Sequence, residues 1–359
     1  MKAVIIEEFG APVQLREVEP QPVSPCEVRI EVGASGICHS DYSIASGQYP
    51  AMTIPLVLGH EGAGRVIEVG SAVRRVAPGD RVICTFVPAC GICWQCLSGR
   101  SHLCETNGKV EKPKLMYDGR LIAALSGLGT MAPLMTVHET NVVKVETDLP
   151  DEQLALIGCG ITTGVGSALW TARVEPGASV AIFGCGGVGL AVLQGARIAG
   201  AAELIAVDPF ASKREMALAM GATHAIDPTA EDPVARIREI TRGRGAEYTF
   251  EVISTPATMR QTYDAACNGG TATMVGSLSP SLELALPANG IHLTGKRLLG
   301  SAYGSAQVQR DMPRLVALAE AGRLDVGSMV SRRISLGEVN EAFDAMKRGE
   351  VVRSVITSF

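Results

Sequence analysis

The sequence predicts an α/β protein with two domains, one mostly antiparallel β and the other a doubly wound parallel sheet. The chain has 359 residues, a length that suggests two domains rather than one. Up to about residue 150, short β-branched runs alternate with glycine- and proline-containing turns, as in antiparallel, barrel-like domains. From there to about residue 300, strands, glycine turns and helices alternate, which predicts a parallel sheet with helices on both faces.

In the first domain, strands are expected where apolar and polar residues alternate with a period of two. The N-terminal segment MKAVIIEEFG is expected to form a first strand that ends in a turn at Gly10. Further strands are expected at residues 26–32, 64–69 and 80–83.

In the second domain, the apolar stretch 178–207 is expected to form a buried strand–helix–strand unit, with strands at residues 179–183 and 204–207. It contains charged residues and several glycines, which argue against a membrane span. Later strands are expected at residues 248–253 and 271–275. Two amphipathic helices, near 312–321 and 336–348, are expected to return to the first domain.

Composition excludes several classes of protein. Hydrophobic residues make up 47% of the chain, which is enough for sizeable cores. The net charge is −5 and no basic block is present, so neither nucleic acid nor an anionic membrane is an expected partner. The N-terminus lacks the long apolar core and cleavage site of a signal peptide. Together with the metal-like spacing of the cysteines, this predicts reduced thiols and a cytoplasmic location.

Four cysteines form the most specific motif of the chain. Cys90, Cys93, Cys96 and Cys104 stand in the order Cys-x2-Cys-x2-Cys-x7-Cys, within a lobe expected at about residues 88–106. Four thiolates in so short a segment are typical of a tetrahedral zinc site with no open coordination position. Such a site is closed to substrate, so the motif predicts a structural zinc ion.

A glycine motif follows the first strand of the predicted parallel sheet. Gly184, Gly186 and Gly189 give G-x-G-x-x-G, with Gly187 and Val188 inside the motif. Glycines in this pattern permit a tight turn, approach of the backbone to a pyrophosphate, and close packing of the helix on the strand. The helix N-terminus adds free N–H groups and the positive end of its dipole. On its own, the pattern fits an ordinary glycine-rich loop equally well.

An acidic residue supports the dinucleotide interpretation. Asp208 ends the next expected strand, 19 residues after Gly189, near the offset of a ribose-binding acid. A carboxylate there accepts hydrogen bonds from a ribose hydroxyl and repels a 2′-phosphate, and no arginine follows it directly. The sequence therefore predicts NAD rather than NADP. Lys213 is a candidate for contact with the ribose, and a solvated helix lysine is its alternative interpretation.

Cys38, His60 and Cys159 make a second candidate metal set, of two thiolates and one imidazole. Three protein ligands leave a fourth position open for water or substrate, and zinc there lowers the pKa of a bound hydroxyl. The sequence alone does not separate these residues from the remaining cysteines. Those are interpreted as small core or loop residues: Cys26, Cys84, Cys185 and Cys267.

Several segments together resemble one family. The chain is similar to the zinc-dependent alcohol dehydrogenases of the medium-chain dehydrogenase/reductase superfamily, from end to end and with motifs in the same order and spacing. The segments that carry the resemblance are the four-cysteine lobe, GICHSD (36–41), GHEGAG (59–64), GCGITTG (158–164) and FGCGGVG (183–189).

The resemblance implies a GroES-like, mostly antiparallel β catalytic domain at residues 1–159 and 303–359, and a Rossmann domain that binds NAD at residues 160–302. It implies two zinc ions per chain and NAD as cofactors, and a homodimer, with a tetramer as the alternative. The expected partner is a small-molecule alcohol or aldehyde.

The resemblance also implies roles for individual residues around the second metal set. Cys38, His60 and Cys159 would be the ligands of a catalytic zinc, and Glu61 a nearby carboxylate that approaches the metal during ligand exchange. Asp41 would be the partner of the His60 imidazole that fixes its tautomer.

On the substrate side, Ser40 would take the proton of the substrate, and Phe86 would line the pocket. Many relatives have a histidine that passes this proton to solvent where this chain has Ser43, so the proton would leave through water or His39. Relatives that act on hydroxymethyl-glutathione have an acidic pair in the pocket. The aligned positions here are Tyr49 and Ala51, which argues against that substrate.

On the cofactor side, His39 and Arg353 would contact the pyrophosphate. Thr163 and Val188 would hold the nicotinamide ring. Each assignment has a structural alternative: Thr163 as a helix cap, Arg353 as a solvated charge, and Phe86 as a core residue.

The predicted function is reversible, NAD-dependent oxidation of a primary aliphatic or aromatic alcohol, by hydride transfer from a zinc-bound alkoxide. A polyol or amino-alcohol dehydrogenase and a glutathione-dependent formaldehyde dehydrogenase are alternatives within the superfamily. An alternative of another class is a non-catalytic, NADH-sensing zinc protein, which would need no second metal set beside Ser40.

Overall fold

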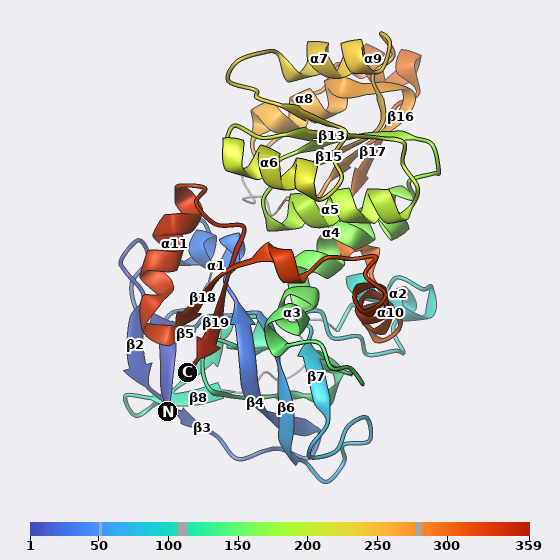
Figure 1. The fold of residues 1–359 in the computed structure, drawn as a ribbon. Helices are drawn as coiled ribbons and strands as arrows, with labels where there is room; N and C mark the ends of the chain where they lie inside the picture. The colour runs from blue at the N-terminus through green and yellow to red at the C-terminus, as the bar shows by residue number, and fades with distance from the viewer. Residues whose placement is uncertain (50–51, 107–113, 277–281) are drawn as a thin grey trace. The chain divides into compact units, whose positions relative to one another are not determined.

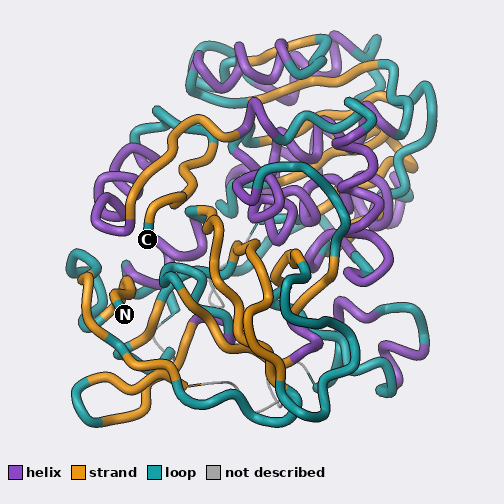
Figure 2. The backbone as a smooth tube through the Cα atoms, turned by 60° about the horizontal axis from the view of Figure 1, so that its bottom comes forward, coloured by secondary structure: helices purple, strands orange, loops and turns teal. Residues whose placement is uncertain are grey.

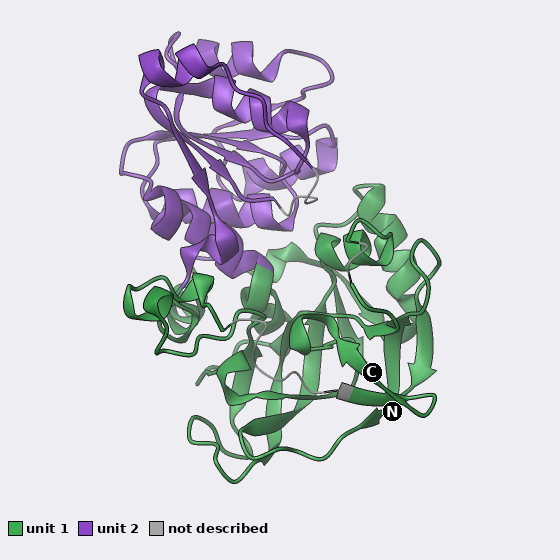
Figure 3. Cartoon of the chain, turned by 180° about the vertical axis from the view of Figure 1, so that it is seen from behind, with its two compact units in different colours: residues 1–159, 307–322, 326–359 green, residues 160–306, 323–325 purple. Residues whose placement is uncertain are grey.

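The computed structural model describes residues 1–49, 52–106, 114–276 and 282–359. The chain divides into two compact units (Figure 3). Unit 1 comprises Met1–Cys159, Gln307–Gly322 and Val326–Phe359, and unit 2 comprises Gly160–Ala306 and Arg323–Asp325.

Unit 1 contains two sheets that are mostly antiparallel, as predicted. The first has the strand order β2-β1-β5-β9-β8-β3, and only its β5–β9 pair is parallel. Its strands are β1 (Lys2–Ile6), β2 (Gln14–Glu17), β3 (Glu19–Pro20), β5 (Leu56–Val57), β8 (Lys114–Tyr117) and β9 (Arg120–Ala124).

The second sheet of unit 1 has the order β11-β7-β6-β4-β19-β18, and β10 also pairs with β4. Its strands are β4 (Glu27–Gly36), β6 (Glu61–Val69), β7 (Arg81–Cys84), β10 (Leu134–His138), β11 (Val142–Lys144), β18 (Val330–Ser335) and β19 (Arg353–Ser358). The antiparallel pairing of β19 with the end of β4 returns the C-terminal segment to the first part of the chain, as the sequence predicts.

The helices of unit 1 are short, and the two longest belong to its C-terminal segments (Figure 1). They are α1 (His39–Ala45), α2 (Trp94–Leu97), α3 (Asp151–Leu156), α10 (Val308–Glu320) and α11 (Val339–Lys347). Single 3-10 turns complete the unit at Ser101–Leu103, Leu125–Gly127, Glu139–Asn141, Gly327–Met329 and Leu336–Glu338. Phe343 of α11 is buried in an apolar cluster with β1 and β19, as expected for an amphipathic helix.

Unit 2 contains a six-stranded parallel sheet in the order β14-β13-β12-β15-β16-β17, so the order reverses between β12 and β15. Its strands run between helices (Figure 2). The strands are β12 (Ser179–Phe183), β13 (Glu203–Val207), β14 (His224–Ile226), β15 (Ala246–Glu251), β16 (Ala266–Met274) and β17 (Arg297–Gly300).

Helices cover both faces of this sheet, with α5 on one face and α7 and α8 on the other (Figure 1). Successive side chains of a strand point to opposite faces of the sheet. Ala181 and Phe183, two residues apart on β12, therefore share one face, where they pack with α7 and α8 in one cluster. The predicted doubly wound architecture is therefore confirmed. The helices are α4 (Thr162–Gly166), α5 (Gly187–Ile198), α6 (Ala211–Ala219), α7 (Pro233–Ile240), α8 (Pro256–Ala265) and α9 (Ala288–Thr294), with a short turn at Ala302–Ser305.

One continuous helical run, Asp151–Ala172, is long and apolar enough to cross a membrane by length and composition. However, 78% of its most apolar window is buried within the structure, as in the core helix of a globular protein. The run contains two π-helical turns, at Ile157–Ile161 and Ser167–Ala172. Such turns widen a helix locally and are frequent at functional sites.

Candidate active site

The junction between β4 and α1 positions Cys38. The strand ends at Gly36, and Cys38 is the N-cap residue of α1. Asp41, in the first turn, accepts a hydrogen bond at Oδ2 from the backbone N–H of Cys38, at 3.1 Å. Its Oδ1 accepts a second bond from the backbone N–H of Gly59, at 3.2 Å. A single buried carboxylate therefore ties the cysteine loop to the segment that carries His60.

His60 and Glu61 lie at the start of β6, beside the end of β4. In the register of this pair, Gly36 is opposite Glu61. A Cβ atom at position 36 would lie 2.3 Å from Oε2 of Glu61. Glycine is therefore required here because only the missing side chain leaves room for the Glu61 carboxylate.

Cys159 lies on the first π-helical turn of the long helical run. The preceding Gly158 fits closely against the end of β7, since a Cβ there would lie 2.9 Å from the carbonyl oxygen of Cys84. This close approach brings the Cys159 thiol to the sheet that carries the other residues of the site.

Four predicted site residues meet as a result. One ligand atom from each of Cys38, His60, Glu61 and Cys159 lies within 4.8 Å of the other three, and all four residues are buried. Oε1 of Glu61 is buried without a hydrogen-bond partner among the described residues. Two sulfurs, one imidazole and a carboxylate with an unpaired oxygen are a donor set that suits zinc. The geometry thus fits a zinc ion held by Cys38, His60 and Cys159, with Glu61 beside it.

The charged side chains of this cluster shift one another's pKa values. A hydrogen bond with Cys159 and the charge of His60 hold the pKa of Cys38 well below its usual value. The same hydrogen bond, together with burial, raises the pKa of Cys159. Burial opposes the charge of His60, but Asp41 and Cys38 outweigh it and raise the pKa of this imidazole well above its usual value. Within the cluster, the Cys38 thiol is therefore more acidic than the Cys159 thiol.

Arg353 lies inside this site rather than on the surface. It is the first residue of β19, is 6% exposed, and donates a hydrogen bond from Nη2 to Oε2 of Glu61. Burial raises the pKa of Glu61 to about 7, although the Arg353 guanidinium acts in the opposite direction. The interpretation of Arg353 as a solvated charge is therefore wrong. Its contact with a pyrophosphate stays a prediction.

Two further side chains border His60. Asp41 is completely buried, and its Oδ1 lies 3.2 Å from Nδ1 of His60. The ring of Phe86 lies perpendicular to that of His60, with 5.5 Å between the centroids. A carboxylate partner such as Asp41 orients a ligating imidazole and raises its basicity.

The predicted proton and substrate residues lie in and after α1. Oγ of Ser40 is 3.7 Å from Sγ of Cys38. His39 is exposed and makes an edge contact with the ring of Tyr42. Tyr49 is partly buried and packs against the apolar cluster of the first sheet. Ala51 lies outside the described residues.

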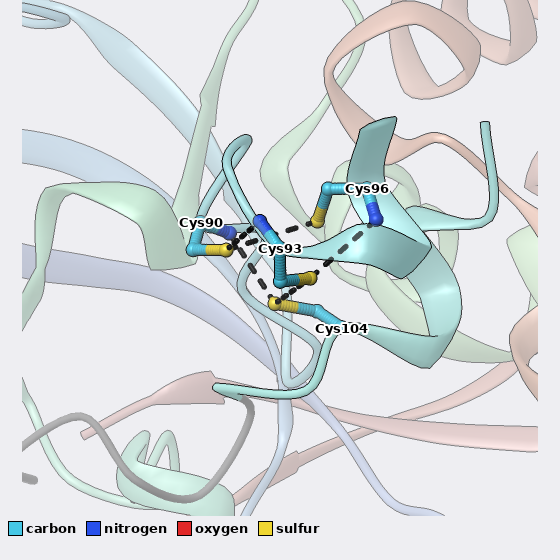
Figure 4. A group of neighbouring side chains, drawn as sticks. All are labelled: Cys90, Cys93, Cys96 and Cys104. Carbon is cyan, nitrogen blue, oxygen red and sulfur yellow. Dashed lines mark hydrogen bonds between the residues drawn. The ribbon is translucent and has the colours of Figure 1, made fainter. Parts of the chain in front are cut away.

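The four cysteines of the lobe also converge (Figure 4). The Sγ atoms of Cys90 and Cys96 are 4.0 Å apart, as are those of Cys93 and Cys104. Tetrahedral zinc with bonds of about 2.3 Å places its sulfurs about 3.8 Å apart. Backbone N–H groups donate to these sulfurs, for example from Cys93 to Cys90 at 3.3 Å. Such donors stabilise thiolates, so the lobe fits a closed zinc site.

In unit 2, the predicted glycine motif connects β12 to α5. Gly184 has φ +97°, a conformation that favours glycine. A Cβ at Gly189 would lie 1.8 Å from the carbonyl oxygen of Gly184, whereas one at Gly186 would meet no atom of the described residues within 4 Å. Gly189 thus permits the helix to pack on the strand, and the space beside Gly186 suits a phosphate at the start of α5. Gly187 is buried, and Val188 is half-buried on the first turn.

Asp208 follows β13 and is buried. Its Oδ2 accepts from the backbone N–H of Cys185 at 2.8 Å, and its Oδ1 from that of Phe210 at 2.9 Å. The carboxylate therefore shapes the glycine loop and still has lone pairs for a ribose hydroxyl. Nζ of Lys213 lies 4.8 Å from the centroid of the Phe210 ring, a cation–π contact.

The structure adds one residue that the sequence analysis missed. Glu251 ends β15 directly opposite Phe183, on the strand next to the point where the strand order reverses. Its Oε1 accepts from the backbone N–H groups of Ile253 and Ser254, while its Oε2 is buried without a partner among the described residues. A carboxylate at the end of a predicted strand was visible in the sequence, but its burial was not.

Comparisons with known proteins agree with this geometry. Residues 24–147 match the family model of the alcohol dehydrogenase GroES-like domain, and residues 187–321 match that of the zinc-binding dehydrogenases. An S-(hydroxymethyl)glutathione dehydrogenase of Synechocystis is 36% identical, with 99% of each chain covered. A class-3 alcohol dehydrogenase of Cereibacter sphaeroides is 37% identical, again with 99% of each covered.

Among solved structures, benzyl alcohol dehydrogenase of Acinetobacter calcoaceticus has a TM-score of 0.93 and is 31% identical, covering 100% of this chain and 99% of its own. These matches confirm the predictions of the fold, of an enzyme, of its reaction class, and of zinc and NAD as cofactors. The chain belongs to the zinc-dependent alcohol dehydrogenases of the medium-chain dehydrogenase/reductase superfamily.

Proposed function

We propose that this enzyme oxidises primary aliphatic or aromatic alcohols to aldehydes, with NAD as the hydride acceptor. The observation that carries the proposal is the convergence of Cys38, His60, Glu61 and Cys159 in a buried cluster with Ser40 beside it. Cys38, His60 and Cys159 would hold the catalytic zinc, and the lobe cysteines would hold a second, structural ion. When bound, zinc polarises the alcohol oxygen and NAD accepts the hydride.

The residues of the site have separate tasks in this proposal. The Ser40 hydroxyl takes the proton of the alcohol and passes it on, while Asp41 keeps His60 in one tautomer. Arg353 neutralises Glu61, so that a carboxylate can remain in a buried site. Phe86 presents an apolar ring next to His60, which favours aliphatic or aromatic substrates over polyols.

In unit 2, the space beside Gly186 and the start of α5 would receive the pyrophosphate, with Asp208 on the adenosine ribose. Thr163 and Val188 would border the nicotinamide, and His39 and Arg353 would contact the phosphates. We also propose a cytoplasmic homodimer. The edge strand β17, whose Leu298 is 44% exposed, is the candidate for pairing with a second copy.

Oxidation of S-(hydroxymethyl)glutathione is a second candidate, because relatives with that name are 36–38% identical. Tyr49 argues against it, since its ring packs against an apolar cluster where an acidic side chain was expected for that substrate.

The test is NADH formation with short aliphatic, long aliphatic, benzylic, secondary and polyol alcohols, and with formaldehyde plus glutathione. Each assay is run before and after removal of metal by a chelator. Chelator-sensitive turnover of aliphatic or benzylic alcohols is expected. Turnover of formaldehyde plus glutathione, without turnover of any of the alcohols, would favour the second candidate. If the zinc-loaded protein turned over none of these substrates, the catalytic proposal would be wrong.

A further inference from the structure

Four hydroxyl groups of unit 2 form one continuous hydrogen-bonded chain. Oγ of Ser305 lies 2.7 Å from Oγ1 of Thr171, which lies 2.9 Å from Oγ of Ser301. Oγ of Ser301 in turn lies 2.8 Å from Oγ of Ser167. Ser167 then donates to the backbone carbonyl oxygen of Thr163 at 2.6 Å. The chain thus links the loop after β17 to the helix that begins at Thr162.

The direction of this chain follows from counting protons. Each hydroxyl has one hydrogen to donate, and a carbonyl oxygen can only accept. Because Ser167 donates to Thr163, Ser301 must donate to Ser167, Thr171 to Ser301, and Ser305 to Thr171. All four bonds therefore point the same way, and bonds in such a chain polarise and strengthen one another.

The loop that the chain holds is in an unusual conformation. Tyr303, Gly304 and Ser305 have φ values of 51°, 63° and 55°, so three consecutive residues are left-handed. Non-glycine residues adopt this conformation only where their surroundings impose it. Backbone contact is one constraint, since a Cβ at Gly166 would lie 2.5 Å from the carbonyl oxygen of Gly304. The hydroxyl chain is the second.

The position of the loop is suited to a bound dinucleotide. It follows the carboxyl end of parallel strand β17, and ligands of open α/β sheets bind beyond that edge. The other end of the hydroxyl chain is the carbonyl oxygen of Thr163. This residue lies four positions after Cys159 in the same helical run. The end of NAD that must approach the substrate at Cys159 is the nicotinamide.

We propose that the hydroxyl chain Ser305–Thr171–Ser301–Ser167 is a positioning element for the nicotinamide half of the cofactor. This inference rests on the function proposed above. A Cβ at Gly304 would lie 2.8 Å from the carbonyl oxygen of Thr163, so the 301–305 loop packs directly on this helix. The hydroxyl chain fixes the loop in that position before the cofactor binds. A loop that is already fixed avoids an ordering step on binding.

The test compares binding of NAD with that of ADP-ribose, which lacks the nicotinamide, by calorimetry on the zinc-loaded protein. Thr171→Val removes the central link at nearly constant shape. We expect its Kd for NAD to rise about tenfold and its Kd for ADP-ribose to stay within about twofold. Thr171→Ser keeps the hydroxyl and should restore NAD binding. The control is Ser179→Ala, which removes a hydroxyl that is hydrogen-bonded to Glu247 at the start of β12. It should leave the Kd values for both ligands unchanged.

If Thr171→Val weakens binding of NAD and ADP-ribose equally, the hydroxyl chain has a general structural role and the inference is overturned. Unchanged binding of both ligands would also overturn it. If this variant does not fold, Ser305→Ala removes only the first donor and should shift the two ligands in the same selective way. The proposed function fails separately, since a wild-type protein that binds no NAD overturns both proposals. A wild type that binds NAD while the variants match it overturns only this one.

Discussion

Oδ1 of Asp41 lies 3.2 Å from Nδ1 of His60, and both side chains are buried. The same carboxylate accepts the backbone N–H of Cys38. One side chain therefore orients two of the three proposed zinc ligands. We expect Asp41→Asn to weaken zinc binding about 10- to 100-fold, as partners of metal-bound histidines do in other sites. Competition with a chromophoric chelator measures this change.

The control for Asp41 is Asp344→Asn, which removes a carboxylate from an exposed ion pair with Lys347. It should retain wild-type zinc affinity because exposed pairs contribute little. Equal zinc affinity in the Asp41 variant and the wild type would contradict the role of Asp41.

Ser40 is the proposed proton acceptor, and its Oγ is 3.7 Å from Sγ of Cys38. We expect Ser40→Ala to lower kcat about 10²- to 10⁴-fold, the usual contribution of a positioned proton-transfer group. The KM for NAD should stay near the wild-type value. Ser46→Ala, at the C-cap of the same helix, should leave kcat unchanged. A kcat for Ser40→Ala equal to that of Ser46→Ala would exclude the relay.

Cys93 contributes one of the four converging sulfurs of the lobe. Structural zinc is worth roughly 10–16 kcal/mol in apparent binding free energy, which is comparable to the stability of a whole domain. We therefore expect Cys93→Ser to bind one zinc per chain instead of two and to unfold at a lower Tm. Metal analysis and calorimetry measure both. Cys26→Ser, at an exposed cysteine outside both clusters, should keep two zinc ions and the wild-type Tm.

Gly186 and Gly189 should respond differently to the same substitution. Gly189→Ala places a Cβ 1.8 Å from the carbonyl oxygen of Gly184, so we expect loss of stability before any cofactor is added. The Cβ of Gly186→Ala meets no atom within 4 Å in the part of the chain that the structure describes, so this variant should keep its Tm while NAD binding weakens. Thermal unfolding and NAD titration separate the two effects. Wild-type NAD affinity in Gly186→Ala would place the pyrophosphate elsewhere.

Asp208 is proposed to select NAD. We expect Asp208→Asn to raise the ratio of kcat/KM for NADP to that for NAD at least tenfold, because the repulsion of a 2′-phosphate is removed. The amide can still accept one of the two backbone hydrogen bonds at this position. Asp264→Asn, in an exposed pair with Arg260, should leave the ratio unchanged. If another residue sets the preference for NAD, Asp208→Asn will also leave this ratio unchanged.

The sequence predicts the elements of this fold well where local pattern determines them. The strand at Ser179–Phe183 has its predicted bounds, since a short apolar run before a tight glycine turn has few alternatives. By contrast, β16 begins at Ala266, five residues before its predicted start. The segment ACNGG resembles a turn, and only pairing of Ala266 with Ala246 of β15 makes it a strand.

The sequence predicts the candidate metal ligands of the site but not the ion pair beside them. Cys38, His60 and Cys159 carry recognisable motifs, so their convergence could be expected. The ion pair of Arg353 with Glu61 could not, because the two residues lie 292 positions apart and only the pairing of β19 with β4 brings them together. Side-chain pairing over such a separation depends on tertiary structure, which no local pattern encodes.

That separation has a consequence for biosynthesis. At translation rates of about 5–20 residues per second, roughly 15–60 s pass between the addition of Glu61 and that of Arg353 to the growing polypeptide. During this interval Cys38, His60 and Glu61 have been made, but the guanidinium that neutralises the carboxylate has not. The nascent protein therefore carries these candidate metal ligands and the Glu61 carboxylate before its own neutralising cation exists. The charge of Glu61 is balanced only once Arg353 has been added.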